Sequence, residues 1–85
     1  MNNYSEKDLI DSDLNQTITR NGKLIEVHIY RLPNTSWTLE VVDEFGNSTV
    51  YDDEFTNDAL ALNALLDDIE KDGIDSFIGT SSNNH

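Results

Sequence analysis

The amino-acid sequence predicts an α+β domain in which a four-stranded antiparallel meander carries a single helix across one face. Three observations lead to this prediction. Residues 17–52 alternate between apolar and polar side chains, as strands with one buried face do. An Asn21-Gly22 pair marks a tight hairpin, because both residue types accept positive φ angles. Beyond residue 55 the apolar residues recur at helical spacing instead.

The first hairpin and the longest strand follow directly from this pattern. A two-residue loop at 21–22 would place Ile18 opposite Ile25, in strands at 17–20 and 23–32. A third strand is expected at 37–43, after a turn that contains Pro33. Since alternate residues of a strand face opposite sides of a sheet, the expected inward set is Ile18, Ile25, Val27, Ile29, Trp37, Leu39, Val41 and Val50.

The fourth strand, expected at 48–52, can pair with the third strand in two registers. A two- or four-residue loop would place Val50 opposite Val41, whereas a three-residue bulged loop would place Thr49 there. The first register is preferred because it keeps both valines in the core. It also turns Thr49 and Tyr51 towards the outer face of the sheet.

The helix is expected to begin after a cap at Thr56 or Asn57 and to end at Gly73. Asp58 in the first turn suits the helix dipole. The stripe expected to cover the sheet is Ala59, Leu62, Leu65, Leu66 and Ile69.

The chain is expected to form one domain with a loose segment at each end. Residues 1–16 are polar and are expected to be mobile or to dock as a short helix through Leu9, Ile10 and Leu14. Residues 17–79 would form the single α+β domain. Residues 80–85, which include His85, are expected to be a disordered tail.

Composition limits the classes of partner. The formal net charge of −12 over 85 residues repels phosphate backbones and anionic lipids, so neither direct nucleic-acid binding nor membrane binding is expected. Only residues 17–32 are net basic, at +2. The absence of cysteine and of a signal-like start favours a cytoplasmic protein. We expect an unidentified protein partner, with a basic protein as one candidate, and a monomer or weak homodimer.

No catalytic, cofactor or metal constellation stands out in the sequence. His28 is the only histidine inside a predicted element, and no nucleophile is specified beside it. The carboxylate runs at 43–44, 52–54 and 67–68 lack the alternating ligand spacing of a calcium loop. We therefore expect no cofactor, no metal and no enzyme activity, and a small enzyme using His28 is the third-ranked hypothesis.

The leading hypothesis is a protein-binding module that uses the outer face of the sheet. Aromatic side chains among polar ones suit a docking surface, and the candidate contact residues are Tyr30, Tyr51, Val42, His28, Thr38 and Thr49. The alternative is a DNA mimic that presents carboxylates to a basic nucleic-acid-binding protein. Its candidate row is Asp53, Glu54, Asp58, Asp67, Asp68, Glu70, Asp72 and Asp75.

The stretch from Trp37 to Asp53, with the leucine-rich helix and Asp72-Gly73-Ile74 after it, resembles a family of small uncharacterised bacterial proteins of about this length. The resemblance covers about residues 20–79. It implies a bacterial cytosolic setting and carries no activity or functional residue with it.

Overall fold

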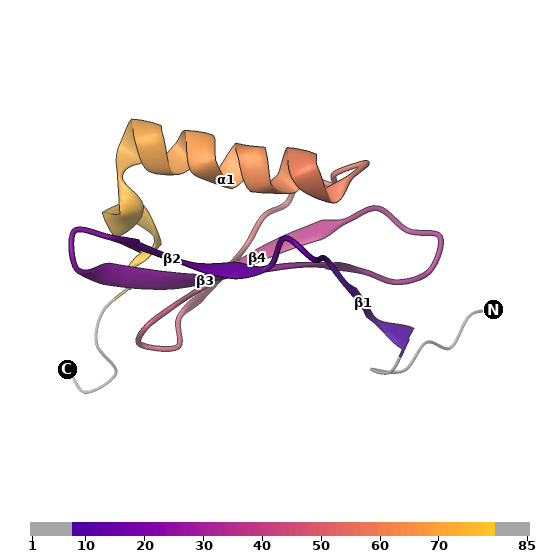
Figure 1. Ribbon diagram of the computed structural model, residues 1–85, viewed down its shortest axis with the longest axis horizontal. Helices are drawn as coiled ribbons and strands as arrows, with labels where there is room; N and C mark the ends of the chain where they lie inside the picture. Colours follow the sequence, from indigo (N-terminus) through magenta and orange to yellow (C-terminus); the bar gives the residue numbers. More distant parts are fainter. Residues whose placement is uncertain (1–7, 80–85) are drawn as a thin grey trace.

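The computed structural model describes residues 8–79 of the protein and confirms the α+β class, with a sheet on one side and a helix across it (Figure 1). The predictions for residues 1–7 and for the tail at 80–85 lie outside the described residues. The elements, in chain order, are β1 (Ile10–Asp11), β2 (Gln16–Arg20), β3 (Lys23–Arg31), β4 (Thr38–Asp43), β5 (Ser48–Val50), α1 (Asp58–Asp72) and the 3-10 helix η2 (Ile74–Phe77).

The first strand of the meander runs in two pieces, and both pair antiparallel with β3. Placing the domain boundary after residue 16 was therefore wrong, because β1 pairs with the end of β3 where a mobile segment or short helix was expected. Between the two pieces the chain bulges away from β3. There the Asn15 side chain accepts a hydrogen bond that a backbone carbonyl would accept in a regular strand pair. Its Oδ1 accepts the Ile29 N–H at 2.7 Å, while the Ser12 N–H donates to the Ile29 carbonyl at 2.9 Å.

The hairpin between β2 and β3 forms as predicted. Ile18 lies opposite Ile25, and the two loop residues have positive φ, 55° at Asn21 and 77° at Gly22. Strand β3 then pairs with β4 along six residue pairs, from Ile25 opposite Asp43 to Tyr30 opposite Thr38. Strand β3 thus pairs with β1, β2 and β4, and β4 in turn pairs with β5.

The preferred register of the last hairpin was wrong. Val41 lies opposite Thr49, and Val50 lies opposite Glu40 with 53% of its surface exposed. The connection is the three-residue bulged loop, Glu44 to Gly46, with Gly46 at φ 86°. Residue 51 therefore faces the helix side, opposite the face on which it was expected.

The Asp43 carboxylate organises this turn. It accepts the N–H groups of Phe45 at 2.9 Å and Asn47 at 2.8 Å, and the Asn47 amide at 3.0 Å. It also accepts the N–H of Gly79 at 2.6 Å, so one side chain joins the β4–β5 turn to the last described residue. Although burial opposes its ionisation, these hydrogen bonds lower the pKa of Asp43 to about 2.

Helix α1 begins and ends where predicted, but it is rotated about its axis. Asn57 caps it through the Leu60 N–H at 2.8 Å, and the Gly73 N–H donates to the Ile69 carbonyl at 2.8 Å. Ala59 is exposed and Leu66 is 36% exposed, so both were wrongly placed in the stripe. The buried residues of α1 are Ala61, Leu65 and Ile69.

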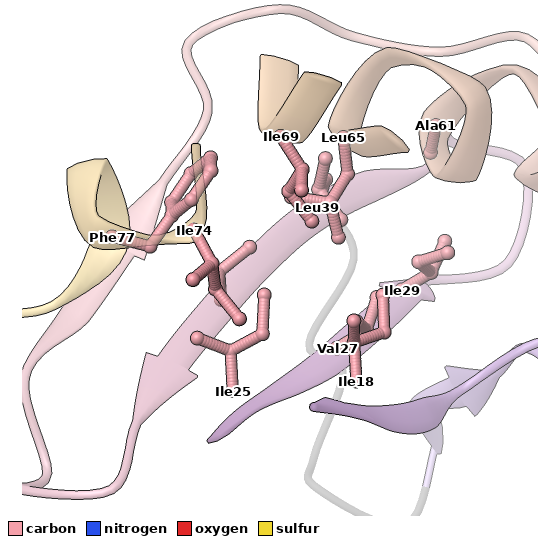
Figure 2. Packing of buried hydrophobic residues seen from close by; sticks show 11 residues of the cluster. Ile18, Ile25, Val27, Ile29, Leu39, Ala61, Leu65, Ile69, Ile74 and Phe77 are labelled. Carbon is pink, nitrogen blue, oxygen red and sulfur yellow. The ribbon is translucent and has the colours of Figure 1, made fainter. Parts of the chain in front are cut away.

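The core lies between α1, η2 and the helix-facing side of the sheet (Figure 2). Ile74 and Phe77 of η2 extend it beyond the end of α1, where η2 contacts β3 and β4. Trp37, expected to be largely buried, is only partly buried at the border of the core. Its ring lies under the Arg31 guanidinium, 5.0 Å from the ring centroid, which keeps it in contact with the surface.

Candidate functional site

The outer face of the sheet is the side opposite α1, and no described element covers it. The strand pairings show which residues lie on this face, because residues opposite each other in neighbouring strands share a face. Thr17 and Thr19 are opposite Glu26 and Leu24, and Asp11 is opposite Tyr30. The strand residues on the outer face are Asp11, Thr17, Thr19, Leu24, Glu26, His28, Tyr30, Thr38, Glu40, Val42, Ser48 and Val50.

Glu40 lies at the centre of this face and orders its neighbours. Its carboxylate accepts the Tyr30 hydroxyl at 3.2 Å and the Ser48 hydroxyl at 2.5 Å, so it joins β3 to β5 across β4. Burial, together with the adjacent Glu40 charge, raises the pKa of the Tyr30 hydroxyl, which stays a hydrogen-bond donor at neutral pH. A partly buried ring with a fixed hydroxyl is a suitable contact for a protein partner.

Two shallow hollows adjoin Tyr30. The first encloses about 400 Å³ and is lined by Leu9, Asp11, His28, Tyr30, Glu40 and Val42. The second encloses about 330 Å³ and runs from Leu9 and Tyr30 towards Thr38 and Glu54. Leu9, just before β1, is 41% exposed and borders both hollows. The hollows thus bring Leu9, Tyr30 and Val42 to one surface, with the carboxylates of Asp11 and Glu40 among them.

The structure brings four of the six predicted contact residues together. Tyr30, Val42, His28 and Thr38 all lie on the outer face, and His28 Nε2 lies 3.2 Å from Glu26 Oε1 beside it. The other two, Tyr51 and Thr49, were wrongly assigned to this face. Both assignments failed for one reason, the one-residue shift in the register of β5.

Tyr51 instead belongs to the packing between sheet and helix. Its N–H donates to the Leu39 carbonyl at 3.0 Å, and its ring stacks on Phe77 with centroids 6.4 Å apart. The hydroxyl donates to Asp68 of α1 at 2.6 Å. Burial and the acceptor carboxylate both raise the pKa of Tyr51 far above its usual range. A Tyr51 variant would therefore test folding rather than binding.

Leu9, Glu40 and Val50 also contribute to the outer face but were not among the predicted contact residues. The alternation of β4 places Glu40 outward, and a carboxylate in a central strand was a usable signal. Val50 was missed because an apolar residue in a short strand was assigned to the core. No sequence pattern indicated that Leu9 would lie on this face, since its position depends on β1 pairing with the far end of β3.

The carboxylates proposed for DNA mimicry do not all face solvent freely. Asp58 accepts the Ser12 hydroxyl at 2.7 Å, and Asp68 accepts the Tyr51 hydroxyl at 2.6 Å. Asp75 pairs with Lys23 at 3.0 Å. The remaining members of the row are exposed: Asp53, Glu54, Asp67, Glu70 and Asp72. Three of the eight thus have partners within the chain, which interrupts the row.

The outer face also holds the group types that an acid–base site would use. His28, Asp11 and Glu40 border one hollow, yet that hollow is shallow and open to solvent. An active site for a small molecule ordinarily encloses most of its ligand, and this surface does not. Among residues 8–79, no group of three histidine or acidic side chains is close enough to hold a metal ion.

No family model matches the chain, and neither a curated protein nor a solved structure matches it. Within residues 8–79, no helix is long and apolar enough to cross a membrane.

Proposed function

We propose that the protein is a non-enzymatic protein-binding module that docks its partner on the outer face of the sheet. The observation that carries the proposal is that Leu9, Tyr30 and Val42 line one uncovered hollow, with Val50 exposed on the same face. Large apolar side chains on one uncovered sheet face are typical of interaction sites. The bacterial cytosolic setting implied by the family resemblance is part of the same proposal.

The order already present on this face supports binding by a preformed surface. Tyr30 is held by Glu40, and Glu40 is held by Ser48, so the central side chains lose little freedom when a partner arrives. Aromatic residues near the centre of an interface commonly contribute most of the affinity. Tyr30 is therefore the expected anchor, and Val42 lines the same hollow.

The proposal is tested by affinity capture from a lysate of the source cells with two matched variants. The first, Tyr30→Ser with Val42→Thr, removes two apolar side chains from the hollow that both residues line. Because neither side chain contributes to the buried core, we expect the fold to be kept and the captured partner to be lost, with binding weakened about 30-fold or more if Tyr30 is a true anchor.

The matched control is Phe45→Ser with Leu60→Ser, which removes exposed apolar groups from the β4–β5 turn and from the helix. This control is expected to capture the partner as the parent does. The proposal fails if the Tyr30 and Val42 variant is folded, by circular dichroism, and still captures the same partner equally well. Loss of capture only on substituting Asp67, Glu70 and Asp72 by their amides would favour DNA mimicry instead.

A further inference from the structure

We infer that the outer face accepts a basic amphipathic helix, that is, a partner helix with an apolar stripe flanked by arginine or lysine. This inference rests on the proposed function and specifies the chemistry of its partner. It follows from how the charges and the apolar residues are sorted between the two faces of the sheet.

The cations of the sheet all lie on the helix side. Lys23 pairs with Asp75 of η2 at 3.0 Å, Arg20 borders a hollow against α1, and Arg31 covers Trp37. The register assigns each of them the same face as the buried isoleucines of β2 and β3. Within the described strands, the outer face therefore carries no lysine or arginine.

Among residues 8–79, the carboxylates of the outer face consequently have no cation beside them apart from a histidine. Glu26 has only His28 beside it, and Glu40 has only two hydroxyl donors. Asp11, at the far side of Tyr30, is exposed. Three carboxylates thus lie among the apolar residues of this face and favour a partner that combines cations with apolar contacts.

The same charges disfavour the other candidate partners of this face, namely a second copy of the chain, nucleic acid and anionic lipid. A second copy of the chain would bring its own three carboxylates against these, without a lysine or arginine on the facing strands to neutralise them. Phosphate backbones and anionic lipid surfaces are repelled for the same reason. A basic protein segment is the partner that the surface fits.

The layer arrangement favours a helix as the form of that segment. Sheets bury an apolar face against a helix or a second sheet, and α1 already satisfies the opposite side of this sheet in that way. The outer face spans the same strands, β3 and β4, that α1 contacts from the other side. A helix of similar length could lay leucines over Tyr30 and Val42 and reach Glu26 and Asp11 with its flanks.

The experiment uses the full chain and two synthetic peptides of 15 residues, the length of α1. One peptide has leucines at helical spacing and arginines on both flanks, and the other has glutamates in place of the arginines. Titration calorimetry at about 0.15 M salt measures the affinity. Backbone amide shifts of isotope-labelled protein locate the contact. The arginine peptide is expected to bind one to one and to shift β3 and β4 rather than the exposed side of α1.

Two variants with equal loss of charge give the decisive comparison. Glu26→Gln with Glu40→Gln neutralises the outer face, whereas Asp67→Asn with Glu70→Gln neutralises the exposed side of the helix. The first is expected to weaken the arginine peptide about tenfold or more, and the second less than about threefold. Equal weakening by both variants would mean general attraction to an acidic protein and would overturn the inference.

The remaining outcomes separate this inference from the proposed function. If both peptides bind alike and only Tyr30→Ser with Val42→Thr weakens them, the face binds but its charges do not choose the partner. If the Tyr30 and Val42 variant binds the arginine peptide as the parent does, the proposed binding face itself is wrong. Absence of binding up to about 1 mM peptide, or a parent dimer formed through this face, also overturns the inference.

Discussion

Truncation of Leu65 to alanine is expected to lower the free energy of unfolding by about 2–5 kcal/mol. Leu65 has no exposed surface and lies at the centre of the buried face of α1, between Ala61 and Ile69 (Figure 2). Its removal leaves a cavity against the sheet as well as lost burial. Denaturant unfolding, followed by the fluorescence of Trp37 and by circular dichroism, measures the loss.

Its neighbour provides the control. Leu66→Ala makes the same chemical change one residue later, where the side chain is 36% exposed and borders the hollow near Arg20. The loss there is expected to be about 1 kcal/mol, because less apolar surface returns to water and no closed cavity forms. Equal losses for the two variants would contradict the rotation of α1 described above.

Replacement of Asp43 by asparagine is expected to cost about 2–3 kcal/mol, because it removes a carboxylate that accepts four hydrogen bonds. An asparagine supplies only one acceptor oxygen, and its amide N–H groups would face the donors of Asn47 and Gly79. Glu44→Gln, in the same turn but exposed, makes the same change of charge and is expected to be nearly neutral. Urea unfolding at neutral pH compares the two variants.

Acid should reproduce part of this loss in the parent protein. The pKa of Asp43 is lowered from 3.8 to about 2 on folding, so its stabilisation is complete above pH 4. It is lost as the pH falls from 4 towards 2. Asp43 is only 4% exposed but lies near the surface, so with solvent screening the contribution is on the order of 1–2 kcal/mol. Asp43→Asn should lack this component of the acid profile, and an unchanged profile would contradict the assignment.

The sequence was sufficient for the elements that are specified locally. Asn21-Gly22 fixed the first hairpin and its register, and the nine-residue alternation of β3 fixed the two faces of the central strand. Asn57 and Gly73 marked the ends of α1. These features depend on residues that are close in the chain, which is why their patterns could be interpreted without tertiary information.

Local residues also indicated the register of β5. In the prediction, the apolar character of Val50 was given more weight than these residues. Asp43 followed by a loop ending in Gly46 fits a three-residue hairpin, with a side chain accepting turn amides and glycine at positive φ. The rule that valine belongs in the core was given more weight than the turn chemistry. As a result, Tyr51 and Thr49 were placed on the outer face.

The rotation of α1 and the role of residues 8–16 could not be obtained in the same way. Leucines at 62, 65 and 66 with alanines at 59, 61 and 64 allow more than one face at helical spacing. The choice is made by close approach of the sheet at Ala61, a tertiary contact. Likewise, β1 exists because β3 extends beyond β2 and leaves Tyr30 and Arg31 in need of a partner strand.

The break in the first strand has a consequence for how the chain can change over evolutionary time. In a continuous strand, one inserted or deleted residue would reverse the facing of everything before it. Here β1 and β2 are aligned to β3 independently, and Asp13 between them is exposed. Ser12 and Asn15 on either side of it both bond Ile29, so a change in length that keeps the facing of Asp11 and Leu9 is confined to Asp13 and Leu14. The facing of the residues beside Tyr30 is thus set by two hydrogen bonds to Ile29 and not by counting back along β2.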